Sequence, residues 1–204
     1  MKISTDTEFV PLLRSGHAGQ VYQKKYYLFG GKFNDQRAYS PIECFNTESL
    51  TWNSLHDTLA ENKIEHTIDV VDKYLVVFGG YEGHRVYNDL KVFDLERNSW
   101  ISIMQKGQAP SHRYAHSSII YKQDLFIFGG MDKQKPLNDL WRFCFSESSW
   151  YQVKYIGLVS PLFRSTLVEV QNGFLILGGA KAYQQYTNSV YLYTHDKNTL
   201  IKIQ

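Results

Sequence analysis

Four short stretches of the 204-residue chain are apolar at nearly every position, and each ends in a pair of glycines. The clearest is Leu125-Phe126-Ile127-Phe128, which precedes Gly129-Gly130. A strand without polar alternation is buried on both faces, so each stretch predicts a strand between two packed layers. The pairs are spaced 49, 50 and 49 residues apart, at Gly30-Gly31, Gly79-Gly80, Gly129-Gly130 and Gly178-Gly179.

Aromatic positions follow the glycine pairs with the same period. One recurrent aromatic position is occupied by Phe45, Phe93, Phe143 and Tyr193, and the positions seven residues further on are Trp52, Trp100, Trp150 and Leu200. A period near 50 residues is typical of repeat architectures. We expect the rings to pack between neighbouring units, where each buries on the order of 150–250 Å².

Each unit is predicted to hold four strands, and no segment has the periodicity of a helix. We expect each glycine pair to end the second strand of its unit, because glycine adopts positive φ and permits close packing. The predicted strands are residues 18–22, 26–29, 41–45 and 51–55; 66–71, 74–78, 89–94 and 99–103; 117–121, 125–128, 139–145 and 150–155; and 166–170, 174–177, 189–193 and 200–203.

The combination of a double glycine, Asn138-Asp139-Leu140, Phe143 and Trp150 resembles the kelch repeat, whose unit is a four-stranded β-propeller blade. The resemblance covers residues 14–204 and implies an all-β fold behind a lead-in of residues 1–13. The implied blades are about 14–62, 63–111, 112–160 and 161–204. Within the family, the run around Arg14, Gly16 and His17 resembles the subgroup that includes the leucine-zipper-like transcriptional regulator and the Rab9-effector proteins.

The number of blades leaves two architectures open. Kelch propellers generally have six or seven repeats, whereas this sequence contains four. The blades either close into a four-blade ring, since propellers typically have 4–8 blades, or form a partial arc of a larger propeller. An arc would leave two apolar blade faces uncovered, so we expect oligomerisation if four blades do not close alone.

Composition excludes several classes of partner. A net charge of +2 gives no general attraction to nucleic acid or acidic membranes, and no apolar run approaches the roughly 20 residues of a membrane span. Residues 1–6 lack the apolar core of a signal peptide. Cys44 and Cys144 fall in third strands of units that should not touch, so we expect no disulfide. A cytoplasmic location is predicted, with the nucleus as the alternative.

Candidate catalytic and metal-binding residues have simpler structural interpretations. His17, His66 and His116 each stand 13 residues before a glycine pair. Three equivalent histidines could hold a metal, but Arg-x-x-His recurs in kelch repeats, which favours a structural role. Nitrile-specifier-like propellers carry Glu-x3-Asp-x3-His, whereas here Lys73 follows Asp69 in the histidine position. We therefore expect no cofactor and no enzyme; the alternative is a small-molecule enzyme with its site at the channel mouth.

Strand direction assigns the loops to two rims. The loop leading into strand one and the loop between strands two and three share one rim. We predict that a partner protein binds there, because arginine, lysine and tyrosine side chains recur in these loops and suit an acidic segment. The residues chosen are Tyr81, Arg85, Arg113, Tyr114 and Lys133; the opposite rim carries Asp94, Glu96, Arg97 and Glu147. The resemblance likewise implies a protein-interaction scaffold or adaptor.

Overall fold

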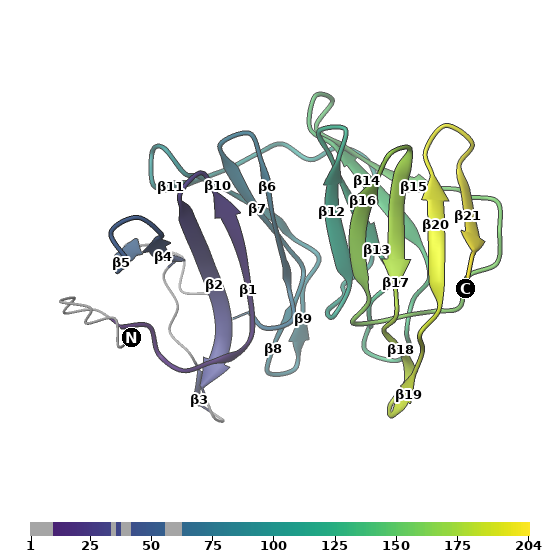
Figure 1. Cartoon of the computed structure of the whole chain (residues 1–204), viewed down its shortest axis with the longest axis horizontal. Coiled ribbons are helices and arrows are strands. Elements are labelled where there is room, and N and C mark those ends of the chain that lie inside the picture. Colours follow the sequence, from purple (N-terminus) through teal and green to yellow (C-terminus); the bar gives the residue numbers. More distant parts are fainter. Residues whose placement is uncertain (1–9, 34–35, 38–41, 56–62) are drawn as a thin grey trace.

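The computed structural model describes residues 10–33, 36–37, 42–55 and 63–204. Within these ranges the regular structure is all β, and four antiparallel sheets of four main strands form a four-blade β-propeller. The blades follow one another in chain order, from purple blade 1 to yellow blade 4 (Figure 1). The fold class predicted from the repeat is therefore confirmed. Predicted features at residues 1–9, 34–35, 38–41 and 56–62 lie outside the described residues.

Each blade is a meander of four strands, with short additional strands at one end. Blade 1 consists of β1 (Ser15–Tyr22), β2 (Lys25–Phe33), β4 (Ile42–Asn46) and β5 (Thr51–Leu55), with β3 (Gln36–Arg37) paired to the end of β2. Blade 2 consists of β6 (Thr67–Val71), β7 (Tyr74–Phe78), β10 (Leu90–Asp94) and β11 (Ser99–Ile101). Blade 3 consists of β12 (Ser117–Tyr121), β13 (Asp124–Phe128), β14 (Leu140–Cys144) and β15 (Ser149–Val153). Blade 4 consists of β16 (Thr166–Val170), β17 (Gly173–Leu177), β20 (Val190–Thr194) and β21 (Thr199–Lys202).

The glycine pairs end the second strand in three blades. Strands β7, β13 and β17 stop at the residue before their pair. In blade 1 this prediction is wrong: β2 runs through Gly30 and Gly31 to Phe33, because Lys32 and Phe33 continue to pair with β3. Two further hairpins were not predicted, β8 (Tyr81–Glu82) with β9 (Arg85–Val86) and β18 (Ala180–Ala182) with β19 (Gln185–Tyr186).

In blades 1 to 3, the glycine pair contacts the next blade. In blade 2, Gly79 and Gly80 have φ of 63° and 91°. A Cβ on Gly79 would lie 2.7 Å from the Arg113 carbonyl oxygen, and the Gly80 N–H donates to that same oxygen at 2.9 Å. Equivalent bonds join Gly31 to Lys63 and Gly130 to Leu162. The repeated glycines thus connect consecutive blades.

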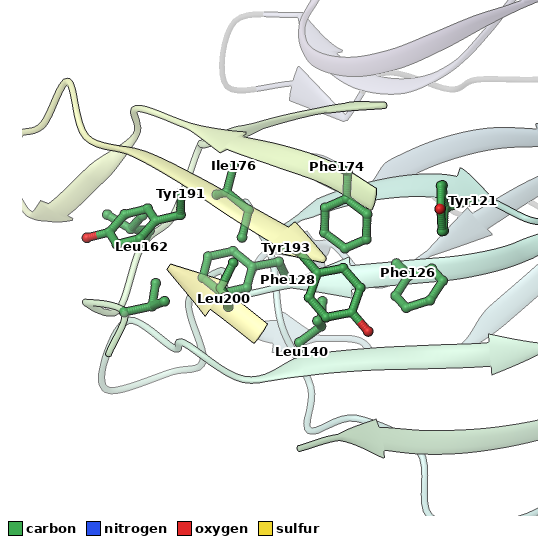
Figure 2. Packing of buried hydrophobic residues seen from close by; sticks show 11 residues of the cluster. Tyr121, Phe126, Phe128, Leu140, Leu162, Phe174, Ile176, Tyr191, Tyr193 and Leu200 are labelled. Atoms are coloured by element: carbon green, nitrogen blue, oxygen red, sulfur yellow. The ribbon is translucent and has the colours of Figure 1, made fainter. Parts of the chain in front are cut away.

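Three hydrophobic cores lie between consecutive blades. The first joins blades 1 and 2, the second joins blades 2 and 3, and the third joins blades 3 and 4. Figure 2 shows Phe128, Tyr193 and Leu200 together in the third core. The described residues form no fourth core between blade 4 and blade 1. Of the two architectures left open by the sequence, the described residues match the partial arc rather than the closed ring.

The tryptophan register behaves as predicted at the inner interfaces. The ring of Trp100 lies 5.7 Å from that of Phe29 in blade 1, and the ring of Trp150 lies 5.3 Å from that of Phe78 in blade 2. Leu200 replaces the tryptophan in the third core and is fully buried. The aromatic partner of Trp52 is Phe45 of its own blade, at 5.1 Å. Packing between blades is confirmed for Trp100 and Trp150 only.

Both cysteines are buried free thiols, Cys44 in blade 1 and Cys144 in blade 3. Burial raises the pKa of the Cys44 thiol. Across the described parts of the chain, there is no helix with the length and apolar character needed to cross a bilayer.

Asp69 of β6 is predicted to make stability depend on pH. Its buried carboxylate accepts a hydrogen bond from Ser118 Oγ of blade 3 at 2.5 Å. Burial raises the pKa of Asp69 from 3.8 to about 6, although the Ser118 bond opposes this. The folded chain therefore holds this proton more tightly than the unfolded chain. Its stabilising contribution is complete below 3.8 and is lost as the pH rises through about 6.

Replacing Asp69 with Asn keeps an acceptor for Ser118 and removes this titration. Relative to the wild type, the variant should gain stability between about pH 4 and pH 7, by on the order of 3 kcal/mol. Urea unfolding at several pH values measures the difference, and the other titrating groups cancel in the comparison. Parallel profiles for the two proteins would show that Asp69 does not titrate in this range.

Candidate protein-binding rim

The leading loops and the loops after the glycine pairs meet at one end of the propeller. Bridges join Ile64 to Tyr81, Tyr114 to Met131 and Phe163 to Ala180, so each leading loop pairs with the loop after a glycine pair. Figure 1 shows β3, β8, β9, β18 and β19 together at this end. The assignment of these loops to a shared rim is therefore correct. We call this end the binding rim; its described parts are residues 14–17, 30–33, 36–37, 63–66, 79–89, 111–116, 129–138, 161–165 and 178–189.

A pocket of about 620 Å³ opens on the binding rim between blades 2 and 3. Arg85 and Lys133 are exposed side chains that line it from neighbouring blades. The guanidinium of Arg85 lies over the Tyr87 ring at 4.7 Å, which limits the conformations of its long side chain. The complete lining is Arg85, Val86, Ser111, His112, Asp132, Lys133 and Gln134.

The acidic residue that lines the pocket, Asp132, already accepts hydrogen bonds from its own loop. Asp132 Oδ1 accepts hydrogen bonds from the N–H groups of Gln134 at 2.7 Å and Lys135 at 2.8 Å. These bonds stabilise the turn and use part of the capacity of the carboxylate. Arg85 and Lys133 outnumber this one acid, so the pocket carries a net positive charge and favours an anionic group.

Tyr81 and Tyr114 form a second group on the same rim. Their ring centroids are 4.8 Å apart, and the Arg164 guanidinium of blade 4 donates to Glu65 of blade 2 nearby. Burial, and then the Glu65 charge, raises the pKa of both phenols, so they stay protonated and able to donate. The structure therefore brings Arg85 together with Lys133, and Tyr81 together with Tyr114, as two separate groups.

Arg113 does not present its guanidinium to a partner, which corrects the expectation for this residue. Its side chain is 0% exposed and donates to both oxygens of Asp139, at 2.8 Å each. It also donates to the Gly129 carbonyl at 2.9 Å. The equivalent Lys63 donates to Asp89 at 2.6 Å. A basic residue that recurs three positions before the repeat histidine was the signal for this structural role.

The five residues chosen from the sequence do not include His112, Ser111 and Gln134, which also line the pocket. They neighbour the predicted positions, and His112 and Gln134 do not recur in the repeat frame. Only the approach of three loops from two blades identifies them. His112 precedes the buried Arg113, so in this loop the exposed side chain is the one next to the predicted residue.

The repeat histidines pack between blades. His66 lies edge-on to Phe29 and His116 edge-on to Phe78, each at 5.3 Å, and His116 Nε2 is 3.0 Å from Thr67 Oγ1. Burial lowers the pKa of His66 to about 3 and that of His116 well below its usual value. These are features of neutral structural rings. The described residues contain no group of three His, Cys, Asp or Glu side chains placed to hold a metal ion.

The acids of the opposite rim already have partners. Asp94 Oδ1 accepts from the N–H groups of Glu96 and Arg97 at 3.0 and 2.9 Å. Lys73 donates to Glu96 at 2.7 Å, and the Tyr151 hydroxyl donates to Glu147. These contacts stabilise the turns between strands three and four, and the Lys73 bond also joins one of them to the turn between β6 and β7.

Comparison with known proteins assigns the family. Residues 2–166 match the domain described as the KLHDC2/KLHL20/DRC7 Kelch-repeats domain. The chain belongs to the kelch-repeat family, and its fold is the propeller of that family.

Several curated relatives share parts of the chain. Acyl-CoA-binding domain-containing protein 4 of Arabidopsis thaliana is 28% identical over 124 residues, which are 59% of this chain and 18% of the relative. Rho GTPase-activating protein gacHH of Dictyostelium discoideum is 34% identical over 91 residues, 42% and 6% of the two proteins. Human kelch domain-containing protein 3 is 27% identical over 124 residues, 55% and 32%. The chain thus spans at most about a third of these three relatives.

Proposed function

We propose that this chain is a protein-interaction module that binds an acidic segment of a partner protein in the pocket between blades 2 and 3. The observation that carries the proposal is the pair of exposed cations, Arg85 and Lys133, that line one 620 Å³ pocket from two blades. Kelch propellers are often used for protein binding, which supports a protein ligand. The tyrosine pair at Tyr81 and Tyr114 adds aromatic surface on the same rim.

The pocket chemistry suits a carboxylate better than a neutral group. Arg85 presents a planar fork that can donate two parallel hydrogen bonds to one carboxylate. Its position over Tyr87 reduces the entropy lost on binding. Lys133 supplies a second cation for a neighbouring acid, and Ser111 and Gln134 can bind the peptide backbone.

The same proposal covers the remaining sequence predictions. The chain would act as a scaffold or adaptor in the cytoplasm, without catalysis or a cofactor of its own. We also propose that, within the family, the chain is related to the subgroup that includes the leucine-zipper-like transcriptional regulator and the Rab9-effector proteins. This relation rests on the run around Arg14 and His17.

Replacing Arg85 and Lys133 together with Ala should weaken binding to acidic peptides. The probes are fluorescent peptides rich in Asp and Glu, with matched Asn and Gln peptides as neutral controls. Loss of each charged contact should cost about 1–3 kcal/mol. The double variant should associate more slowly, with a weaker dependence on salt. Fluorescence anisotropy and stopped-flow mixing measure both effects.

The matched control is Glu96→Ala with Glu147→Ala on the opposite rim, which should bind the acidic peptides as the wild type does. If this variant loses binding while Arg85→Ala/Lys133→Ala retains it, the opposite rim is the binding face. Equal binding of acidic and neutral peptides would show that the pocket does not select carboxylates.

A further inference from the structure

Each inner interface joins two different blade faces. We call the face that packs on the following blade the forward face, and the face that packs on the preceding blade the rear face. In the third core, blade 3 contributes a forward face of Phe126, Phe128 and Leu140, and blade 4 contributes a rear face of Phe174, Ile176, Tyr193 and Leu200. The other two cores are built from equivalent positions. A forward face is thus covered by a rear face at all three interfaces.

Blade 4 has a forward face that no described blade covers. Cross-strand pairing aligns Val168, Leu175, Leu192 and Ile201 in one apolar row. Val168 is 42% exposed and Ile201 47% exposed. A Cβ added to Gly178 would meet only the Thr187 carbonyl oxygen of its own blade, at 3.3 Å. The equivalent glycines of blades 1 to 3 contact the blade that follows.

Blade 1 has a rear face that is likewise covered by no described blade. Cross-strand pairing aligns Val21, Tyr26, Phe45 and Trp52. Val21 is 55% exposed, and the other three side chains are partly exposed. At the equivalent positions Trp100 and Trp150 pack on a phenylalanine of the preceding blade. Trp52 therefore has the ring of an interface residue on a face that no described blade covers.

The backbone bonds between blades stop at blade 4. Glu65 N–H donates to the Gly16 carbonyl, Ala115 N–H to that of Glu65, and Arg164 N–H to that of Ala115. Among the described residues, the Arg164 carbonyl accepts no bond in turn, and the Gly179 N–H has no partner equivalent to that of Gly80. By the pattern of the other blades, the leading loop of a further blade would supply the partner of both groups.

We propose that a second copy of this chain covers these faces, with the forward face of blade 4 in each copy packed on the rear face of blade 1 in the other. The two contacts are related by a twofold axis and close a ring of eight blades, within the range seen in propellers. Leu177 then lies against Trp52 of the second copy, as Phe78 lies against Trp150. The Arg164 carbonyl accepts from Gly16 of the second copy, which continues the backbone series.

A second copy fits because the chain carries both halves of the interface it repeats three times. The proposal is independent of the proposed function, since the binding-rim pocket lies between blades 2 and 3, away from both faces. Each contact is heterologous, with different surfaces on the two sides. This property separates it from a dimer in which one face binds a copy of itself.

Sedimentation velocity tests the assembly with the intact chain. The wild type should reach twice the 23.8 kDa mass of one chain. The forward-face variant Val168→Lys/Ile201→Lys and the rear-face variant Val21→Lys/Trp52→Lys should each be monomeric. Their circular dichroism and thermal unfolding should still show a folded propeller. The control Met104→Lys/Leu158→Lys adds the same charges at side chains 72% and 95% exposed elsewhere, and should dimerise like the wild type.

Mixing the two variants gives the decisive result. A dimer of one forward-face and one rear-face variant retains one unaltered interface, so the mixture should form a weak one-to-one dimer that neither variant forms alone. A wild type that stays monomeric at its highest soluble concentration would overturn the proposal. So would open-ended polymers, or a rear-face variant that dimerises normally, because the latter would indicate that the forward face binds itself.

Discussion

Replacing Trp150 with Ala should lower the free energy of unfolding by about 3–5 kcal/mol. The indole is 4% exposed in the core between blades 2 and 3, and its ring contacts Phe78 across the interface and Phe143 within its blade. Its Nε1–H donates to Gln105 Oε1 of the segment after blade 2 at 3.0 Å. Truncation leaves a cavity between two blades and removes this bond, so both blades lose packing together.

The matched control is Tyr151→Ala, at the next position of the same strand. The Tyr151 side chain is 41% exposed, and its ring contact is with the Arg142 guanidinium at the surface. We expect a loss of about 1 kcal/mol or less. Urea unfolding followed by circular dichroism measures both variants. A Trp150→Ala protein with the midpoint of the wild type would show that the interface does not depend on this ring.

The repeat explains why the fold could be predicted from sequence. Each strand position recurs in four blades, so the same pattern can be compared four times along the sequence. The double glycine and the aromatic register therefore identify the second, third and fourth strands without tertiary information. The Gly80 bond to Arg113 gives the physical reason for the pattern. Where pairing extends beyond the repeat, as in β2 through Phe33, the pattern predicts too short a strand.

The candidate site was less predictable because exposure depends on partners in space. Arg85 and Arg113 are both loop arginines in the sequence, yet Arg85 is exposed and Arg113 is fully buried. Its partner, the partly buried Asp139, lies 26 residues away, at the end of the loop between strands two and three of blade 3. Blade 4 carries Leu162 and Ser189 at the two equivalent positions. This joint replacement was the available sign that the arginine and the aspartate act as a pair.

The electrostatics of this pair indicate what its loss should do. Burial alone would raise the pKa of Asp139, but the hydrogen bonds and charge of Arg113 hold it below the usual 3.8. A carboxyl with a lowered pKa stabilises the folded chain above the unfolded pKa and loses this contribution as the pH falls below it. The advantage of the wild type over a variant without Arg113 should therefore shrink below about pH 4.

Arg113→Leu should lower the free energy of unfolding at neutral pH by about 3–5 kcal/mol, because it leaves Asp139 charged and largely buried without its partner. The double variant Arg113→Leu/Asp139→Ser reproduces the pair that blade 4 uses, where Leu162 is fully buried. It should recover most of that loss, since an apolar replacement of a buried ion pair is often close to neutral. Urea unfolding of the wild type, both single variants and the double variant completes a double-mutant cycle. A double variant no more stable than Arg113→Leu would show that the arginine acts through its bond to the Gly129 carbonyl, at 2.9 Å, rather than through Asp139.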